Sequence, residues 1–154
     1  MYEKFGQFID GSWSPSSNKE TYEVINPATE EVLGHASKAT PEDVDRALKS
    51  AEKGLAVWKK ITPWERSYIL RRIADKLREK KDVLAKWMTL ENGKPLAEGV
   101  GETNGAADIF EWNAEETKRI FGQTIESRFE DTRVHVYYQP VGVVAALSPW
   151  NFPL

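Results

Sequence analysis

The chain has 154 residues, enough for one ordinary domain, and its 40% hydrophobic and 29% charged residues are typical of a globular protein. This composition excludes a disordered or fibrous chain. The formal net charge of -3, with acidic and basic residues mixed along the chain, argues against nucleic acid as a partner.

The first residues carry charges and no long apolar run, so they do not read as a secretory leader. No stretch approaches the roughly 20 apolar residues that a membrane-spanning helix needs. We therefore expect a cytoplasmic protein without membrane contact. The sequence contains no cysteine, which excludes disulfides, a cysteine-ligated metal ion and a thiol nucleophile within these residues.

A small β-structure is predicted to open the chain. Asp10 and Gly11 supply the positive φ angles of a tight hairpin turn. Tyr22 and Val24 then alternate with polar neighbours, as in a half-buried strand, and residues 32–36 read as a short extended segment.

Helices are predicted next, and each begins with a clear signal. Thr40 and Thr62 are each followed by a proline and by acidic residues, which marks both threonines as helix N-caps. After Thr40 the apolar residues recur every three or four positions, at Val44, Ala47, Leu48, Ala51, Leu55 and Trp58. After Thr62 a second apolar stripe, interrupted by charges at residues 80–82, continues until Gly93 ends it.

A third long helix is predicted from about Pro95 to Phe121, with basic residues in its last turn and Gly122 as a left-handed stop. Three glycines interrupt it, and each costs about 1 kcal/mol relative to alanine: Gly99, Gly101 and Gly105. Either another element packs closely there or the helix is irregular. Glu98 and Glu102 lie one turn apart, and we interpret them as a solvated helix face. We expect no metal site.

The last stretch differs in kind. Residues 134–138 alternate between apolar and polar, which predicts a strand with two unlike faces. Residues 141–147 are wholly non-polar and predict a strand covered on both sides, as in a parallel sheet flanked by helices. A parallel neighbour needs a crossover of about a dozen residues, which cannot follow Leu147 here. We therefore expect this strand to belong to a larger sheet.

Five segments together resemble the aldehyde dehydrogenase superfamily across nearly the whole chain: IDGSW at 9–13, INPAT at 25–29, ENGKP at 91–95, QPVGV at 139–143 and SPWNFPL at 148–154. The last is the most specific, because it directly follows the apolar run. Residues 110–125, which contain FEW, AEE, KR and GQTI in that order, are most similar to succinate-semialdehyde dehydrogenases.

The resemblance implies an α/β fold with a small β-segment, three long helices, arm strands and a first buried strand leading to the active site. Residues 1–121 would be the amino-terminal part of a cofactor-binding domain. Residues 122–140 would be the strands of an oligomerisation arm that pairs across subunits of a homo-oligomer. Residues 141–154 would be the first strand and the loop that lead to the active site.

The implied activity is NAD- or NADP-dependent oxidation of a small aldehyde to its acid, with succinate semialdehyde favoured and other aliphatic aldehydes open. By this resemblance Asn151 donates its side-chain amide to the substrate oxyanion, and Ser148, Pro149 and Trp150 line the nicotinamide side of the cofactor cleft. From the residues alone, Asn151 could equally be a turn residue bonded to its own backbone, and Trp150 could be core packing.

By the same resemblance, the nucleophilic cysteine, the general-base glutamate and the phosphate-side elements of the cofactor site come later in the family's chain, and none of them is among these residues. We therefore expect the chain to be the amino-terminal portion of a working dehydrogenase and to show no turnover in isolation. The alternative is a stand-alone, non-catalytic protein that oligomerises or regulates through exposed strands and helix faces.

Overall fold

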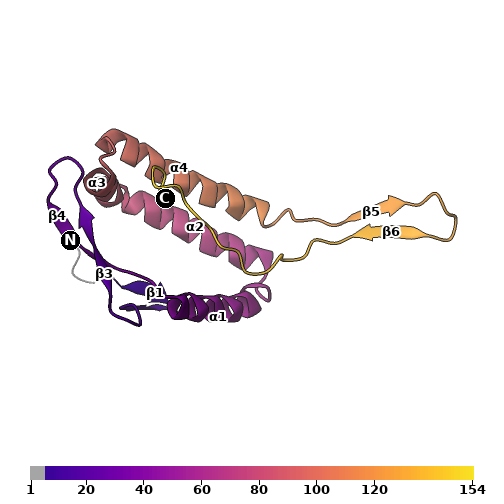
Figure 1. The fold of residues 1–154 in the computed structure, drawn as a ribbon. Coiled ribbons are helices and arrows are strands. Elements are labelled where there is room, and N and C mark those ends of the chain that lie inside the picture. The colour runs from indigo at the N-terminus through magenta and orange to yellow at the C-terminus, as the bar shows by residue number, and fades with distance from the viewer. Residues whose placement is uncertain (1–5) are drawn as a thin grey trace.

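Two antiparallel hairpins open the computed structural model, which describes residues 6–154, so residues 1–5 of the predicted segment 1–121 lie outside the described part. Strand β1 (Gln7–Ile9) pairs with β2 (Ser12–Ser14), and β3 (Thr21–Ile25) pairs with β4 (Val32–Ser37) (Figure 1). Asp10 and Gly11 join the first two strands with φ angles of 54° and 76°. The predicted hairpin turn and opening β-structure are confirmed.

Helices α1 (Pro41–Trp58) and α2 (Pro63–Glu79) begin where the sequence predicts. The side-chain oxygens of Thr40 and Thr62 each accept a hydrogen bond from the backbone N–H of the third helical residue, Asp43 or Glu65. In return, the carboxylate of that residue accepts a hydrogen bond from the backbone N–H of the threonine. These reciprocal bonds satisfy donors that would otherwise be unpaired at the helix start. Local sequence chemistry therefore fixes both boundaries.

Helices α2, α3 (Lys81–Asn92) and α4 (Leu96–Glu116) pack into a three-helix layer, with α4 against both of the others (Figure 1). The fully buried apolar side chains at this junction are small: Ala74, Ala85, Ala107 and Ala114. Arg78 of α2 bonds Asp108 and Glu111 of α4 at 2.8 and 2.6 Å. None of the helices in residues 6–154 combines the length and apolar character needed to cross a membrane.

Two predicted helix boundaries were wrong. The second stripe forms two helices, because Lys80 takes non-helical angles (φ -100°, ψ 7°) at the charged break, so residues 6–154 contain four helices where three are predicted. The last helix ends at Glu116 rather than near residue 121. Gly122 is not a left-handed stop; it sits where a Cβ would lie 2.5 Å from the carbonyl oxygen of Val136, at the base of the next hairpin.

That hairpin pairs β5 (Gln123–Glu126) with β6 (Arg133–Val136) and projects away from the helices (Figure 1). The predicted strand at 134–138 is therefore found, displaced by a residue or two. Residues 141–147 do not form the predicted covered strand: they have no strand partner among the described residues, and Val141 and Leu147 are each 93% exposed. The reason is that a strand takes its hydrogen bonds and its cover from neighbours, and no other strand of residues 6–154 lies beside this segment.

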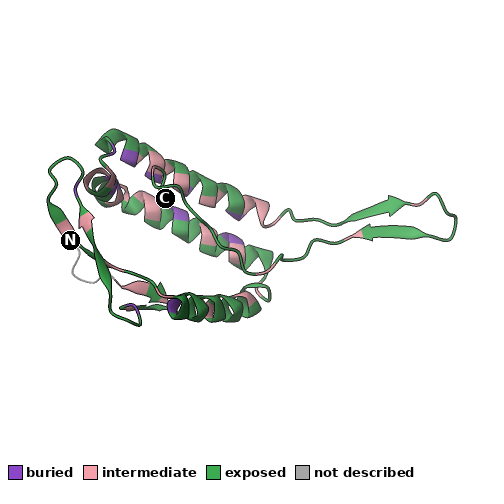
Figure 2. Ribbon diagram, viewed as in Figure 1, coloured by how far each residue is buried: buried purple, intermediate pink, exposed green. Residues whose placement is uncertain are grey.

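Much apolar surface is uncovered. The accessible surface is 11841 Å², whereas a compact monomer of this mass exposes about 7900 Å². Exposed residues cover most of the ribbon in Figure 2. The predicted stripe of α1 is among them, since Val44 and Leu48 remain about half exposed. Apolar exposure of this extent is uncommon in monomeric soluble proteins.

Asp43 joins the opening hairpin to α1. Its carboxylate is 1% exposed and accepts the backbone N–H of Thr40 at 3.0 Å, the backbone N–H of Ser17 at 3.1 Å and the Gln7 side-chain amide at 3.3 Å. The Thr40 backbone bond is the largest cause that lowers the pKa of Asp43 from 3.8 to about 2. The charged form is therefore favoured in the folded state.

We expect Asp43→Asn to make the protein less stable at neutral pH and to flatten its acid sensitivity. Because the folded-state pKa is depressed, the stabilisation from Asp43 is complete above about pH 4 and disappears as pH falls toward about 2. Thermal unfolding followed by circular dichroism should show a difference between wild type and variant that narrows across this window. A difference that stays constant from neutral pH to pH 2 would contradict the assignment.

Candidate functional site

The SPWNFPL segment predicted to carry the site lies against the junction of α3 and α4. The side-chain amide of Asn92 donates to the carbonyl of Trp150 at 2.7 Å, and the ammonium group of Lys94 donates to the carbonyl of Asn151 at 2.6 Å. Asn92 and Lys94 belong to the ENGKP segment. Two motifs nearly 60 residues apart in the chain are therefore brought together through the main chain of residues 150–151.

A buried ion pair makes the second connection. Lys94 pairs with Glu102 of α4, and the two side chains are 8% and 7% exposed. The second carboxylate oxygen of Glu102 accepts the backbone N–H of Leu154 at 3.1 Å. The Lys94 ammonium also lies 4.4 Å from the centre of the Phe152 ring. One ion pair thus contacts three residues of the terminal segment.

Gly93 gives these side chains their positions. It takes a left-handed conformation (φ 78°) at the end of α3, and its N–H bonds the carbonyl of Thr89 at 3.0 Å. Only a residue without Cβ adopts these angles readily, and a Cβ here would also lie 3.2 Å from Pro27. The chain reverses at this glycine, so Asn92 and Lys94 flank the reversal and both reach the terminal segment.

The terminal segment itself forms a turn, in which the Phe152 N–H bonds the carbonyl of Pro149 at 3.1 Å. Asn151 occupies this turn and is half-buried, but its side-chain amide has no hydrogen-bond partner among residues 6–154. The turn-residue interpretation is therefore only half met: the turn exists, but the Asn151 side chain does not bond its own backbone. The amide is available to a ligand.

Ser148, Pro149 and Trp150, predicted to contact a cofactor, are all exposed, and Trp150 is 81% exposed. Trp150 is therefore not a core residue in this structure. Beside it lies a groove of about 560 Å³ between α3 and the terminal segment. Its walls come from Tyr22, Leu84, Trp87, Met88, Glu91, Asn92, Trp150, Pro153 and Leu154. The groove presents aromatic and aliphatic walls beside the turn that carries Asn151.

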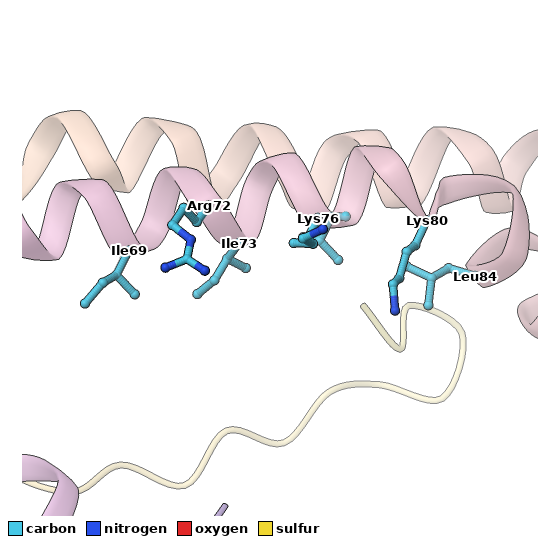
Figure 3. A pocket seen from close by; sticks show the side chains of 7 residues that line it. Ile69, Arg72, Ile73, Lys76, Lys80 and Leu84 are labelled. Carbon is cyan, nitrogen blue, oxygen red and sulfur yellow. The ribbon is translucent and has the colours of Figure 1, made fainter.

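A second hollow of about 610 Å³ lies on the exposed face of α2 and the start of α3 (Figure 3). Its apolar lining residues are Ile69, Ile73, Leu77 and Leu84, with the stems of Arg72, Lys76 and Lys80 around them. Figure 3 shows labelled side chains of this lining, among them Ile69, Ile73 and Leu84, on the side of the helices where the terminal segment runs. The lining combines no acid, base and nucleophile, and it consists of aliphatic side chains and the stems of basic ones.

Glu102 was assigned wrongly from the sequence. It was expected on a solvated face with Glu98, but only Glu98 is exposed, and Glu102 is the buried partner of Lys94. The burial of Lys94 and the role of Asn92 were also missed. The sequence holds a usable signal, because the ENGKP and SPWNFPL segments belong to one resemblance and each contributes polar groups that need partners. No group of three or more metal-ligating side chains occurs in the described range 6–154.

Comparison with known proteins places these features in context. A family model described as the aldehyde dehydrogenase family matches residues 13–154. A glutarate-semialdehyde dehydrogenase of Pseudomonas aeruginosa is 46% identical over 146 residues, covering 95% of this chain and 30% of that protein. The NADP(+) succinate-semialdehyde dehydrogenase of Escherichia coli K12 is 45% identical over 145 residues, covering 94% of this chain and 30% of the relative.

Solved structures of aldehyde dehydrogenases also match this chain. A succinate-semialdehyde dehydrogenase from Burkholderia pseudomallei matches with a TM-score of 0.93 and 42% identity over 97% of this chain and 31% of that one. A betaine aldehyde dehydrogenase from Staphylococcus aureus in complex with NAD+ matches with a TM-score of 0.91 and 35% identity, over 99% and 31% of the two chains. The α/β fold class is confirmed. The chain spans about 30% of the length of these relatives.

Proposed function

This chain belongs to the aldehyde dehydrogenase family, and on that premise we propose that it forms the oxyanion side of the active centre in an enzyme oxidising a small aldehyde to its carboxylic acid. The observation that carries the proposal is the state of Asn151. Its main chain is held by Lys94, whereas its side-chain amide is left without a partner in the described chain.

The reaction needs a hydrogen-bond donor of this kind. When a nucleophile attacks the aldehyde carbon, the carbonyl oxygen gains negative charge, and a donor fixed beforehand at that oxygen lowers the barrier. The Asn151 amide donates without titrating, so it stays a donor at any working pH and cannot take a proton from the nucleophile. The nucleophile and the general base would come from other parts of the enzyme.

NAD or NADP would accept the hydride when bound. The residues present fit such a cofactor: Ser148 is exposed with no hydrogen-bond partner in residues 6–154, and the exposed Trp150 ring borders an open groove with apolar walls. We assign Ser148, Pro149 and Trp150 to cofactor contact. Support comes from the relatives, one named for NADP(+) and one solved with NAD+.

We also propose three parts for the chain, with residues 1–121 contributing to a cofactor-binding domain and residues 141–154 leading to the active site. Residues 122–140 would be an arm that pairs with another subunit. The β5–β6 hairpin supports this, because it projects beyond the helices and its strands are almost wholly exposed (Figure 1). A two-stranded hairpin standing alone is marginally stable in water, so pairing would stabilise it.

The substrate we favour is succinate semialdehyde or glutarate semialdehyde, because relatives above 40% identity carry those names. The test is NAD(P)H formation by the enzyme that contains this chain, with both acid semialdehydes, the uncharged butanal and the cationic betaine aldehyde. One charge-assisted hydrogen bond to the substrate carboxylate contributes about 1.5–3 kcal/mol, so kcat/KM should favour the acid semialdehydes by at least about tenfold.

A preference for butanal or betaine aldehyde would overturn the substrate class. No NAD(P)H with any aldehyde would overturn the enzymatic proposal and favour the non-catalytic alternative. Oligomer formation by a chain that lacks turnover would then be the property to pursue.

A further inference from the structure

We propose that Lys94, neutralised by Glu102, is a positioning residue that holds the Asn151 main chain so that the side-chain amide stays aimed at the reacting oxygen. The proposal rests on the proposed function of Asn151. It concerns Lys94, to which the sequence assigns no role beyond its place in the ENGKP segment, and Glu102, which the sequence places on a solvated helix face.

The first observation is how Lys94 uses its donors. An ammonium group has three N–H bonds. One is directed at Glu102 and another at the Asn151 carbonyl, while the centre of the Phe152 ring lies 4.4 Å from the ammonium nitrogen. Within residues 6–154, the contacts of this cation other than the one with its counter-charge are therefore with the turn that carries the amide.

The second observation is that Glu102 binds the same terminal segment at another residue. One carboxylate oxygen meets Lys94 and the other accepts the Leu154 N–H at 3.1 Å. The pair therefore holds residues 151 and 154 at two points. Because the Asn92 amide holds the Trp150 carbonyl independently, three anchors fix a segment that belongs to no helix or strand.

Burial shields the Lys94–Glu102 pair from water. Both charged side chains are more than nine-tenths buried, so the pair is shielded from the water that weakens exposed ion pairs. Taking two charges out of water is costly, and such pairs are weak evidence for stability alone. This ion pair also contacts the terminal segment at residues 151 and 154, so it can fix one conformation of the turn that carries Asn151.

The kinetic test measures Lys94→Met in the enzyme that contains this chain, alone and combined with Asn151→Ala. A misplacement of about 1 Å can cost roughly 100-fold in rate. Since Asn92 still holds the neighbouring carbonyl, we expect Lys94→Met to lower kcat by about tenfold, with KM for the cofactor nearly unchanged. In the Asn151→Ala background the same substitution should change kcat by less than about twofold, because residues that act as a unit are not additive.

A purely structural lysine would give the same tenfold loss in both backgrounds, and that result would overturn the proposal. Lys76→Met is the matched control, since Lys76 forms an exposed pair with Glu79 on α2 and should leave turnover unchanged. If Asn151→Ala itself leaves turnover intact, the proposed function fails, and the positioning role fails with it. Whether the Lys94–Glu102 pair holds the terminal segment can still be measured separately.

The second readout needs no activity. Amide hydrogen exchange of this chain should be faster at Phe152 and Leu154 in Lys94→Met than in wild type, by about tenfold, with amides of α2 and α4 unchanged. The double variant Lys94→Met/Glu102→Gln removes both charges and guards against unfolding by an unpaired buried carboxylate. Equal exchange at Phe152 and Leu154 in wild type and both variants would show that the pair does not hold the turn.

Discussion

Replacing Asn151 by alanine is expected to lower kcat for aldehyde oxidation by roughly 100- to 1000-fold, the usual effect of losing one oxyanion donor. The Lys94 ammonium group donates to the main-chain carbonyl of Asn151, and this hydrogen bond does not involve the Asn151 side chain. The turn should therefore persist in the variant. Cofactor affinity should therefore change by less than about twofold. Steady-state kinetics together with a cofactor titration by fluorescence would separate the two effects.

Two companion variants sharpen this expectation. Asn151→Asp keeps the size of the side chain but replaces a donor by an acceptor that repels the developing negative charge, so it should be at least as damaging as alanine. Asn113→Ala is the control, because Asn113 is an exposed residue of α4 whose side-chain amide donates to the Ile109 carbonyl of its own helix. Unchanged turnover in Asn151→Ala would remove the oxyanion role.

Features governed by neighbours in the chain were predictable from the sequence. The hairpin turn at Asp10 and Gly11 and the caps at Thr40 and Thr62 depend on backbone angles and on side chains three residues away. The family resemblance also indicated the segment that carries Asn151. The hairpin turn and the two caps agree with the structure because no distant partner is needed to specify them.

Features governed by distant partners were not predictable in this way. The Lys94–Glu102 pair joins a loop to the second turn of α4, and a helix-face pattern cannot show that one of two glutamates is buried. The apolar run at 141–147 shows the opposite error, because burial was predicted and exposure is found. Its composition predicts a covered strand, but residues 6–154 provide no neighbouring strand to cover it. In both cases the sequence does not show which part of the protein lies next to the residue or segment in question.

Gly99 shows how one such contact can be tested. Its position in α4 is buried, and a Cβ there would lie 3.1 Å from both the Cα and the carbonyl oxygen of Ala85 in α3. Backbone atoms of a packed helix cannot move aside as a flexible side chain can. We therefore expect Gly99→Ala to destabilise the protein by about 1–3 kcal/mol, as overpacking does elsewhere, despite the higher helix propensity of alanine.

Gly101 provides the matched control two residues later in the same helix, because nothing lies within 4 Å of the Cβ that alanine would add. Gly101→Ala should raise stability by up to about 1 kcal/mol, since it gains propensity without a clash. The two substitutions are chemically identical, so opposite shifts in urea midpoint would isolate the close approach of α3 and α4. Stabilisation by both would show that the helices can separate at Gly99. The glycine would then be dispensable to the layer that supports Lys94 and Glu102.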